Sequence, residues 1–352
     1  MKKGQHLSAL TIAAAFIGTV VGAGFATGQE VLQFFTLYGK MGFVGIILAC
    51  ILFCFFGFAV MKISRDLKAD SHCELVRFSA GLKLGLFLDW FITISFVGVL
   101  VVMAAGAGAI VEEHFNLSSL YGSIVIVLLA FFTVVSGLSN VLKTIGIVVP
   151  FLLVIVLGVA LFSIVKDPVT IQKINIIESL EPPVTKSWLW AALLYVSYNI
   201  LLAVAILTPL GVEAPNKRTM FQGSMIGALG LGIGILAISL AIISAAPESL
   251  AFQVPMVFLA KGFNTVTALC YGLILLLEIY TTTVGILYGF SARVAYRYIY
   301  RYLWAAGVCV FAVLAAQLGF SRVITMVYPL MGFVGLAFLA VILWTGIREH
   351  WR

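Results

Sequence analysis

Residues 17–30, IGTVVGAGFATGQE, lie in the first hydrophobic segment of the chain and carry glycine at positions 18, 22, 24 and 28. Glycine inside a helix costs about 1 kcal/mol relative to alanine. Two interpretations are open. The glycines could let a second helix approach closely, as small-xxx-small motifs do, or they could mark a point where the helix is broken. The rest of the chain has to decide between them.

Composition places the chain in a membrane. Of its 352 residues, 62% are hydrophobic and 10% are charged, which is more apolar surface than a soluble protein of this length can bury. Unbroken apolar runs, such as residues 41–61, are too long for the alternating strands of a β-barrel and fit transmembrane helices. We therefore expect an all-α integral membrane protein whose first partner is the lipid bilayer.

Catalytic and metal-binding motifs are missing from the sequence. The four His and five Cys residues do not cluster at metal-ligand spacing, and we find no HExxH motif, carboxylate pair or Ser/His arrangement. The net charge of +7 comes from basic residues in short loops, so it reports orientation and not a nucleic-acid partner. We expect no enzyme activity, no bound cofactor and no nucleic acid.

Ten apolar segments, separated by charged or Pro-rich breaks, predict ten transmembrane helices. They are residues 8–37, 41–64, 84–111, 119–138, 142–165, 187–211, 220–245, 264–291, 299–318 and 322–347. Most of the 21 Lys and Arg residues fall on the side that carries both termini, and the positive-inside rule makes that side cytoplasmic. We expect a multi-pass protein of the bacterial cell (inner) membrane with cytoplasmic N- and C-termini.

The longest hydrophilic connection, residues 166–186, is expected outside the cell and divides the chain into two groups of five spans. These groups are residues 1–165 and 187–347, and residues 348–352 form a cytoplasmic tail. An odd number of spans gives the second half the opposite orientation in the membrane. Such inverted repeats are typical of secondary transporters, whose sites lie at the midplane between discontinuous helices.

The first span is long enough to be broken. A continuous helix of about 30 residues would measure about 45 Å, against a hydrocarbon core of about 30 Å. A break at residues 22–24 would leave carbonyl groups of residues 18–21 and amide groups of residues 24–26 without helical partners. The carbonyls could coordinate a small cation, and the amides could hold a carboxylate.

The sixth and eighth spans carry polar groups in otherwise apolar runs. The sixth contains YVSYN at residues 195–199, and its asparagine could accompany a second break or form an interhelical hydrogen bond. On the eighth, Glu278, Thr281 and Thr282 share one helical face. Oxygen ligands suit a hard cation such as Na⁺, but the threonines could instead bond their own helix beside a protonated Glu278. An intramembrane carboxylate is a functional candidate by default.

Glu30 follows the glycines on the outer half of the first span. We expect it to line the entrance or to have a structural role, paired with Lys40 or Arg322.

The run GAGFATGQEVLQFF, residues 22–35, resembles the YkvI-type bacterial membrane proteins of the LeuT-fold amino acid–polyamine–organocation (APC) superfamily. Together with ten spans divided five and five, the resemblance covers nearly the whole chain. It implies two intertwined inverted repeats with helices 1 and 6 broken at the substrate site.

The resemblance also implies positions for ion and solute. The sodium ligands would be the carbonyls of Gly18, Val21 and Glu278 and the hydroxyls of Thr281 and Thr282, with Thr283 as the neighbouring alternative. The solute carboxylate would meet the backbone of Val20, Gly22 and Gly24, and the remaining solute contacts would be Phe25, Phe96, Tyr195, Ser197, Tyr198 and Asn199. Phe25 stands where neurotransmitter transporters place an asparagine for a second ion, so one sodium is expected. The sixth span lacks the glycines expected at its break.

These features predict a secondary active transporter of a small amino-acid-like solute that works by alternating access. Its coupling ion would be one Na⁺ held between helices 1 and 8. Proton coupling through Glu278 is one alternative, and a ligand sensor or channel on the same fold is another. The identity of the solute, the direction of transport and the oligomeric state stay open at this stage.

Overall fold

The computed structural model describes residues 7–69, 72–136, 141–180, 184–294 and 298–350, and these residues form helices and connecting loops without a strand. Six helices contain stretches long and apolar enough to cross a membrane. They are α4 (Lys40–Leu67), α5 (His72–Phe115), α9 (Trp188–Glu213), α10 (Lys217–Ser244), α12 (Thr265–Val294) and α14 (Phe320–His350). Together with the composition, they make this a multi-pass membrane protein.

The remaining predicted spans correspond to shorter or bent helices. These are α1 (Ala9–Val20), α6 (Ser119–Ser136), α7 (Val141–Lys166) and α13 (Tyr298–Ala316). After a bend of 114°, α7 is followed by α8 (Ile171–Glu178), which the sequence analysis did not predict. Thr170 caps α8 by accepting a hydrogen bond from the backbone N–H of Lys173, and Ile177 is buried. Since six helices within the described residues meet the length criterion by themselves, the count of ten spans stays a prediction.

The first span is interrupted twice. Helix α1 ends at Val20, α2 (Ala23–Ala26) follows, and α3 (Gln29–Phe34) begins after Gly28. Gly28 has φ +82°, and a Cβ there would lie 2.9 Å from Cγ of Met256. The left-handed conformation of Gly28 is what allows the second interruption.

Three backbone carbonyls of the interrupted span have hydrogen-bond partners outside the regular helices, one from the span itself and two from neighbouring helices. The hydroxyl of Thr27 donates to the Gly24 carbonyl at 2.8 Å, and that of Tyr271 on α12 donates to the Ala26 carbonyl at 2.6 Å. The backbone N–H of Met256, on α11 (Pro255–Lys261), donates to the Thr27 carbonyl at 3.1 Å. Non-helical backbone is tolerated at membrane depth only when such partners are supplied.

Helix α9 is continuous through Asn199, so the break predicted for the sixth span is wrong. The side-chain amide of Asn199 donates to the Tyr195 carbonyl, one turn earlier, at 2.9 Å. It therefore supports the helix from within instead of replacing a lost backbone partner. The only glycine in α9 is Gly211, near its C-terminal end, so the middle of the helix lacks the conformational freedom that a break requires.

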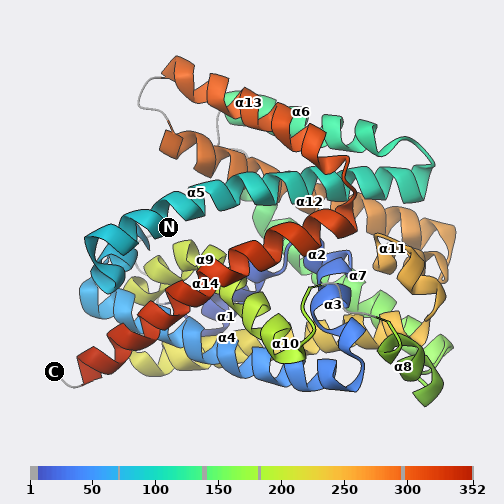
Figure 1. The fold of residues 1–352 in the computed structure, drawn as a ribbon, viewed down its shortest axis with the longest axis horizontal. Helices are drawn as coiled ribbons and strands as arrows, with labels where there is room; N and C mark the ends of the chain where they lie inside the picture. Colours follow the sequence, from blue (N-terminus) through green and yellow to red (C-terminus); the bar gives the residue numbers. More distant parts are fainter. Residues whose placement is uncertain (1–6, 70–71, 137–140, 181–183, 295–297, 351–352) are drawn as a thin grey trace.

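The helices form two packed groups. Helices α1, α4, α9 and α10 pack together, and α5, α6, α12 and α13 form a second group that lies at the top of Figure 1. Helix α14 packs against both α9 and α5, and α7 packs against both α10 and α12. Each group takes two helices from residues 1–165 and two from residues 187–347, so segments far apart in the sequence are interleaved.

Candidate functional site

The candidate site lies at the interruption of the first span, where Glu30 of α3 turns its carboxyl group back over Gly24. Glu30 is only 4% exposed. A Cβ at Gly24 would overlap Oε1 of Glu30, so the carboxyl occupies the space that any other residue at position 24 would fill. A glycine six positions earlier is therefore what allows this acidic group to reach the break.

Two tyrosines from different helices hold the carboxyl of Glu30. The hydroxyl of Tyr198 on α9 donates to Oε2 of Glu30 at 2.7 Å. The ring of Tyr328 on α14 stacks on that of Tyr198, with centroids 4.7 Å apart and planes 9° apart, and its hydroxyl interacts with the same carboxyl. Both tyrosines are buried. These contacts join α3, α9 and α14 at one point.

Tyr195 lies one helical turn before Tyr198 and is fully buried. Its ring packs at 4.8 Å from that of Phe35 and at 5.5 Å from those of Phe34 and Tyr198. Within the described residues, its hydroxyl has no hydrogen-bond partner. Most buried hydroxyl groups in folded proteins have such a partner.

Glu30 has no cationic partner in the part of the chain that the structure describes. The ion pairs there join Lys40 to Glu178 and Lys173 to Asp167. The expectation that Glu30 would pair with Lys40 or Arg322 is therefore wrong. Lys40 lies at the start of α4, and its backbone N–H also donates a hydrogen bond to the carboxyl of Glu178 on α8. A buried acid without a described cationic partner is an unusual electrostatic arrangement.

The other predicted solute contacts have various surroundings. The hydroxyl of Ser197 donates to the Gly332 carbonyl on α14 at 2.7 Å, so it joins two helices. The ring of Phe25 packs beside Gly234 of α10, and that of Phe96 packs beside Gly289 of α12. Val20 is buried at the end of α1, Asn199 bonds within its own helix, and a Cβ at Gly22 would meet nothing within 4 Å.

The predicted ion ligands lie on two elements. Gly18 belongs to the last turn of α1, and the backbone N–H of Val21 closes that turn on Ile17, so nearby carbonyls lack helical partners. On α12, the Thr281 hydroxyl donates to the Glu278 carbonyl at 2.9 Å, and that of Thr283 donates to the Ile279 carbonyl at 2.6 Å.

These threonine bonds are the back-bonding alternative noted from the sequence. Glu278 is 4% exposed, its carboxyl interacts with Thr282, and its Oε2 has no hydrogen-bond partner among the described residues. The cation site itself stays a prediction.

Glu30 and Tyr328 are the site residues that sequence reasoning did not assign to the site. Glu30 carried a signal, since it is an acid next to the predicted break. Tyr328 carried none, because its place beside Tyr198 depends on the packing of α14 against α9.

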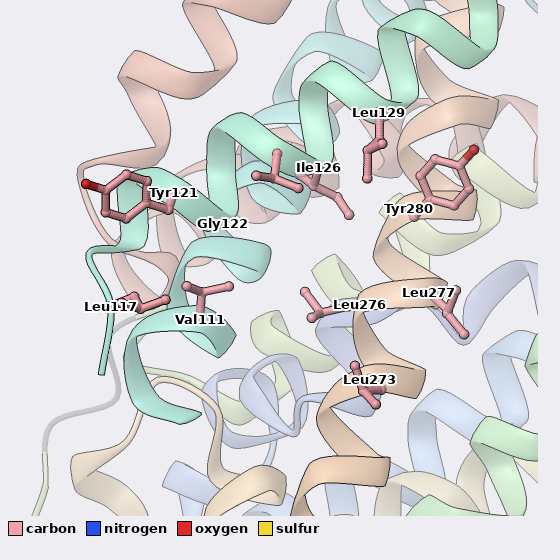
Figure 2. Close-up of a pocket in the computed structure, with 11 residues that line it drawn as sticks. Val111, Leu117, Tyr121, Gly122, Ile126, Leu129, Leu273, Leu276, Leu277 and Tyr280 are labelled. Atoms are coloured by element: carbon pink, nitrogen blue, oxygen red, sulfur yellow. The ribbon is translucent and has the colours of Figure 1, made fainter. Parts of the chain in front are cut away.

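A separate groove of about 650 Å³ lies between α5, α6 and α12 (Figure 2). Its lining is apolar apart from the hydroxyl groups of Tyr121 and Tyr280, and the latter bonds Thr133 at 2.8 Å. With no charged residue in its lining, the groove offers no chemistry comparable to the site at Glu30.

Comparisons with known proteins agree with this architecture, although no family model matches the chain. The membrane protein YkvI of Bacillus subtilis is 32% identical over 340 residues, covering 96% of this chain and 95% of that protein. The structure of MhsT in complex with L-phenylalanine matches with a TM-score of 0.62 at 16% identity, covering 95% of this chain and 89% of that one.

A substrate-bound, outward-open Na⁺-coupled sialic acid symporter matches with a TM-score of 0.59 at 14% identity, covering 95% of this chain and 78% of that one. Identities this low establish a shared fold, which is the LeuT fold expected from the sequence. Because it is 32% identical to YkvI over 96% of its length, the chain belongs to the family of that B. subtilis membrane protein, as its GAGFATGQEVLQFF run indicates.

Proposed function

We propose that the protein is a secondary active transporter of the APC superfamily that moves a small amino-acid-like solute across the bacterial cell membrane by alternating access. The observation that carries this proposal is the doubly interrupted first span with a buried carboxyl at its break. Transporters of this architecture build their sites at such discontinuous helices. The fold shared with an Na⁺-coupled symporter supports the same function.

The solute would bind at the break, beside Gly22 and Gly24 and against the rings of Tyr195 and Tyr198. Both tyrosines belong to α9, which packs against α1, α4 and α14, so a solute there would touch several elements at once. Rocking of one helix group against the other would then expose the site to each side of the membrane in turn.

The coupling ion would be one Na⁺ between α1 and α12. Its ligands would be the carbonyls of Gly18, Val21 and Glu278 and the hydroxyls of Thr281 and Thr282, with Thr283 as the neighbouring alternative. Oxygen-only ligation suits a hard cation. Coupling to protons through Glu278 is the second candidate, and the observation that favours it is the buried Oε2 without a described partner.

The proposal is tested by solute uptake into proteoliposomes. A thermal-shift screen of amino acids, with and without Na⁺, first selects a stabilising solute. We expect that solute to accumulate above its external concentration when an inward Na⁺ gradient is imposed, and an imposed proton gradient tests the second candidate. Binding without accumulation under either gradient would instead identify a sensor, and downhill flux alone a channel.

We predict that Thr282→Ala removes the Na⁺ dependence of solute binding, because the cation would lose an oxygen ligand. Isothermal titration of the selected solute at low and high Na⁺ measures the effect. Thr345→Ala is the matched control, since its buried hydroxyl bonds the Val341 carbonyl within α14. Unchanged Na⁺ stimulation of solute binding in Thr282→Ala would contradict the assigned ion site.

Glu278→Gln distinguishes Na⁺ coupling from proton coupling. It should abolish proton-driven uptake, because it removes the titratable carboxyl, but leave the Glu278 carbonyl available as an Na⁺ ligand.

A further inference from the structure

We propose that Glu30 binds the cationic amino group of the solute, in a site walled by Tyr195, Tyr198 and Tyr328. This inference rests on the proposed transport function and deepens it, because it names the charged group that the solute presents to the break.

The first step concerns the space above Gly24. A solute carboxylate placed on the Gly24 backbone would have to share that space with Oε1 of Glu30. Two carboxylates at such a distance repel each other strongly where the surroundings are apolar. The protein's own acid therefore disfavours the anionic end of an amino acid at Gly24 and favours its cationic end.

The second step concerns the missing counter-charge. Within the described residues, the buried acidic side chains are those of Glu30 and Glu278, and neither forms an ion pair. Charged side chains inside membrane proteins normally pair with a partner of opposite charge or mark a pathway for ions and substrates. An ammonium group on the solute would supply the charge that Glu30 lacks.

The third step concerns the walls. Tyrosine rings attract cations through their negative faces. The ring of Tyr198, whose hydroxyl bonds Glu30 at 2.7 Å, lies 5.5 Å from that of Tyr195 and stacks on that of Tyr328, so the three rings form one cluster beside the carboxyl. An ammonium group carries several N–H donors, and the Tyr195 hydroxyl is a buried acceptor without a described partner. One N–H of the ammonium group would donate to the Glu30 carboxyl and another to the Tyr195 hydroxyl, which would then have a role in binding the solute.

Binding measurements on the purified full chain test the proposal. The probes are L-alanine, L-leucine and L-phenylalanine, each compared with its amine-only analogue (ethylamine, 3-methylbutylamine, 2-phenylethylamine) and its acid-only analogue (propanoate, 4-methylpentanoate, 3-phenylpropanoate). We expect at least one amine to raise the unfolding temperature while its matched acid does not. If no amine binds, or if the acids bind as well as the amines, the proposal falls.

Glu30→Gln keeps the shape of the side chain but removes its charge. We expect the affinity for the stabilising amine to fall about 10- to 100-fold, which is the effect of losing a hydrogen bond to a charged group. Glu248→Gln is the matched control, because Glu248 is an exposed acid on the surface segment Glu248–Ala251. Unchanged amine affinity in Glu30→Gln would overturn the assignment.

Tyr195→Phe provides a test that does not depend on the stability of Glu30→Gln. The hydroxyl has no described partner, so its removal should leave the unfolding temperature of the unliganded protein unchanged or higher. The amine affinity should nevertheless fall about 3- to 10-fold, the effect of one hydrogen bond. Full affinity in this variant would remove Tyr195 from the site and contradict the proposed arrangement.

Uptake measurements separate this inference from the proposed function. If amines bind through Glu30 but do not accumulate in proteoliposomes, transport fails and the site stands. If an acid-only solute accumulates and Glu30→Gln transports it normally, transport stands and the amine site fails.

Discussion

At the scale of single residues, Gly24 and Glu30 act as a pair. The absent side chain at position 24 leaves room for the carboxyl of Glu30, and Tyr198 then holds that carboxyl by a 2.7 Å hydrogen bond. Gly22, two positions earlier at the same break, has open space where a Cβ would lie. The two glycines therefore differ although they share a break. Gly24 makes room for a charged group, and Gly22 lies in the connection between α1 and α2.

We predict that Gly24→Ala lowers both the unfolding temperature and the affinity for solute, because the new Cβ would displace the Glu30 carboxyl from Tyr198. The loss of a buried, charge-assisted hydrogen bond costs about 1.5–3 kcal/mol, more than the roughly 1 kcal/mol that alanine gains in helix propensity. Gly22→Ala is the matched control and should not lower the unfolding temperature. Equal shifts in the two variants, measured by thermal unfolding in detergent, would contradict this role for Gly24.

At the scale of elements, the end of α5 supports the segment that carries α11. The carboxyl of Glu113 accepts hydrogen bonds from the backbone N–H groups of Gln253 and Val254, at 2.5 and 3.1 Å. Helix α11 begins at the next residue, and its Met256 bonds the Thr27 carbonyl at the second interruption of the first span. A carboxylate on α5 thus stabilises the broken span through an intervening short helix.

Glu113→Ala should loosen this segment, because two backbone donors lose their shared acceptor at a cost of about 1–3 kcal/mol. We expect faster proteolysis within residues 246–263 and a lower unfolding temperature, both read from time courses of limited digestion and thermal scans. Glu112→Ala removes a neighbouring exposed acid and is the control. Identical digestion of the two variants would show that Glu113 does not hold α11.

At the scale of the whole molecule, the two helix groups interleave residues from both halves of the chain. Helices α1 and α4 pack with α9 and α10, and α5 and α6 pack with α12 and α13 (Figure 1). Five spans in each half would give the halves opposite orientations, and the positive-inside rule, applied to the distribution of Lys and Arg, predicts cytoplasmic termini.

Reporter fusions test that orientation. A fluorescent protein that matures only in the cytoplasm should fluoresce when it is fused to either terminus. Alkaline phosphatase, which is active only outside the cytoplasm, should be active when it is inserted in the connection at residues 166–186. An active phosphatase at a terminus would reverse the predicted topology and with it the inside and outside of the transport cycle.

The sequence by itself determined the properties that depend on local composition. Apolar runs specify membrane helices because each span must satisfy its own backbone in lipid, and clustered glycine in an overlong span marks the first break, near Gly22. The run at residues 22–35 also identified the family, which the similarity to YkvI confirms.

Only the tertiary structure decided which side chains meet. Glu30 and Tyr198 are 168 positions apart, and Tyr328 reaches them only because α14 packs on α9. Helix α9 is continuous through Asn199, against the expectation of a break. Local patterns specify where helices begin and end, but contacts between distant helices depend on how whole surfaces fit together. The meeting of a buried acid with Tyr198 and Tyr328 is therefore a property of the fold and not of any one segment.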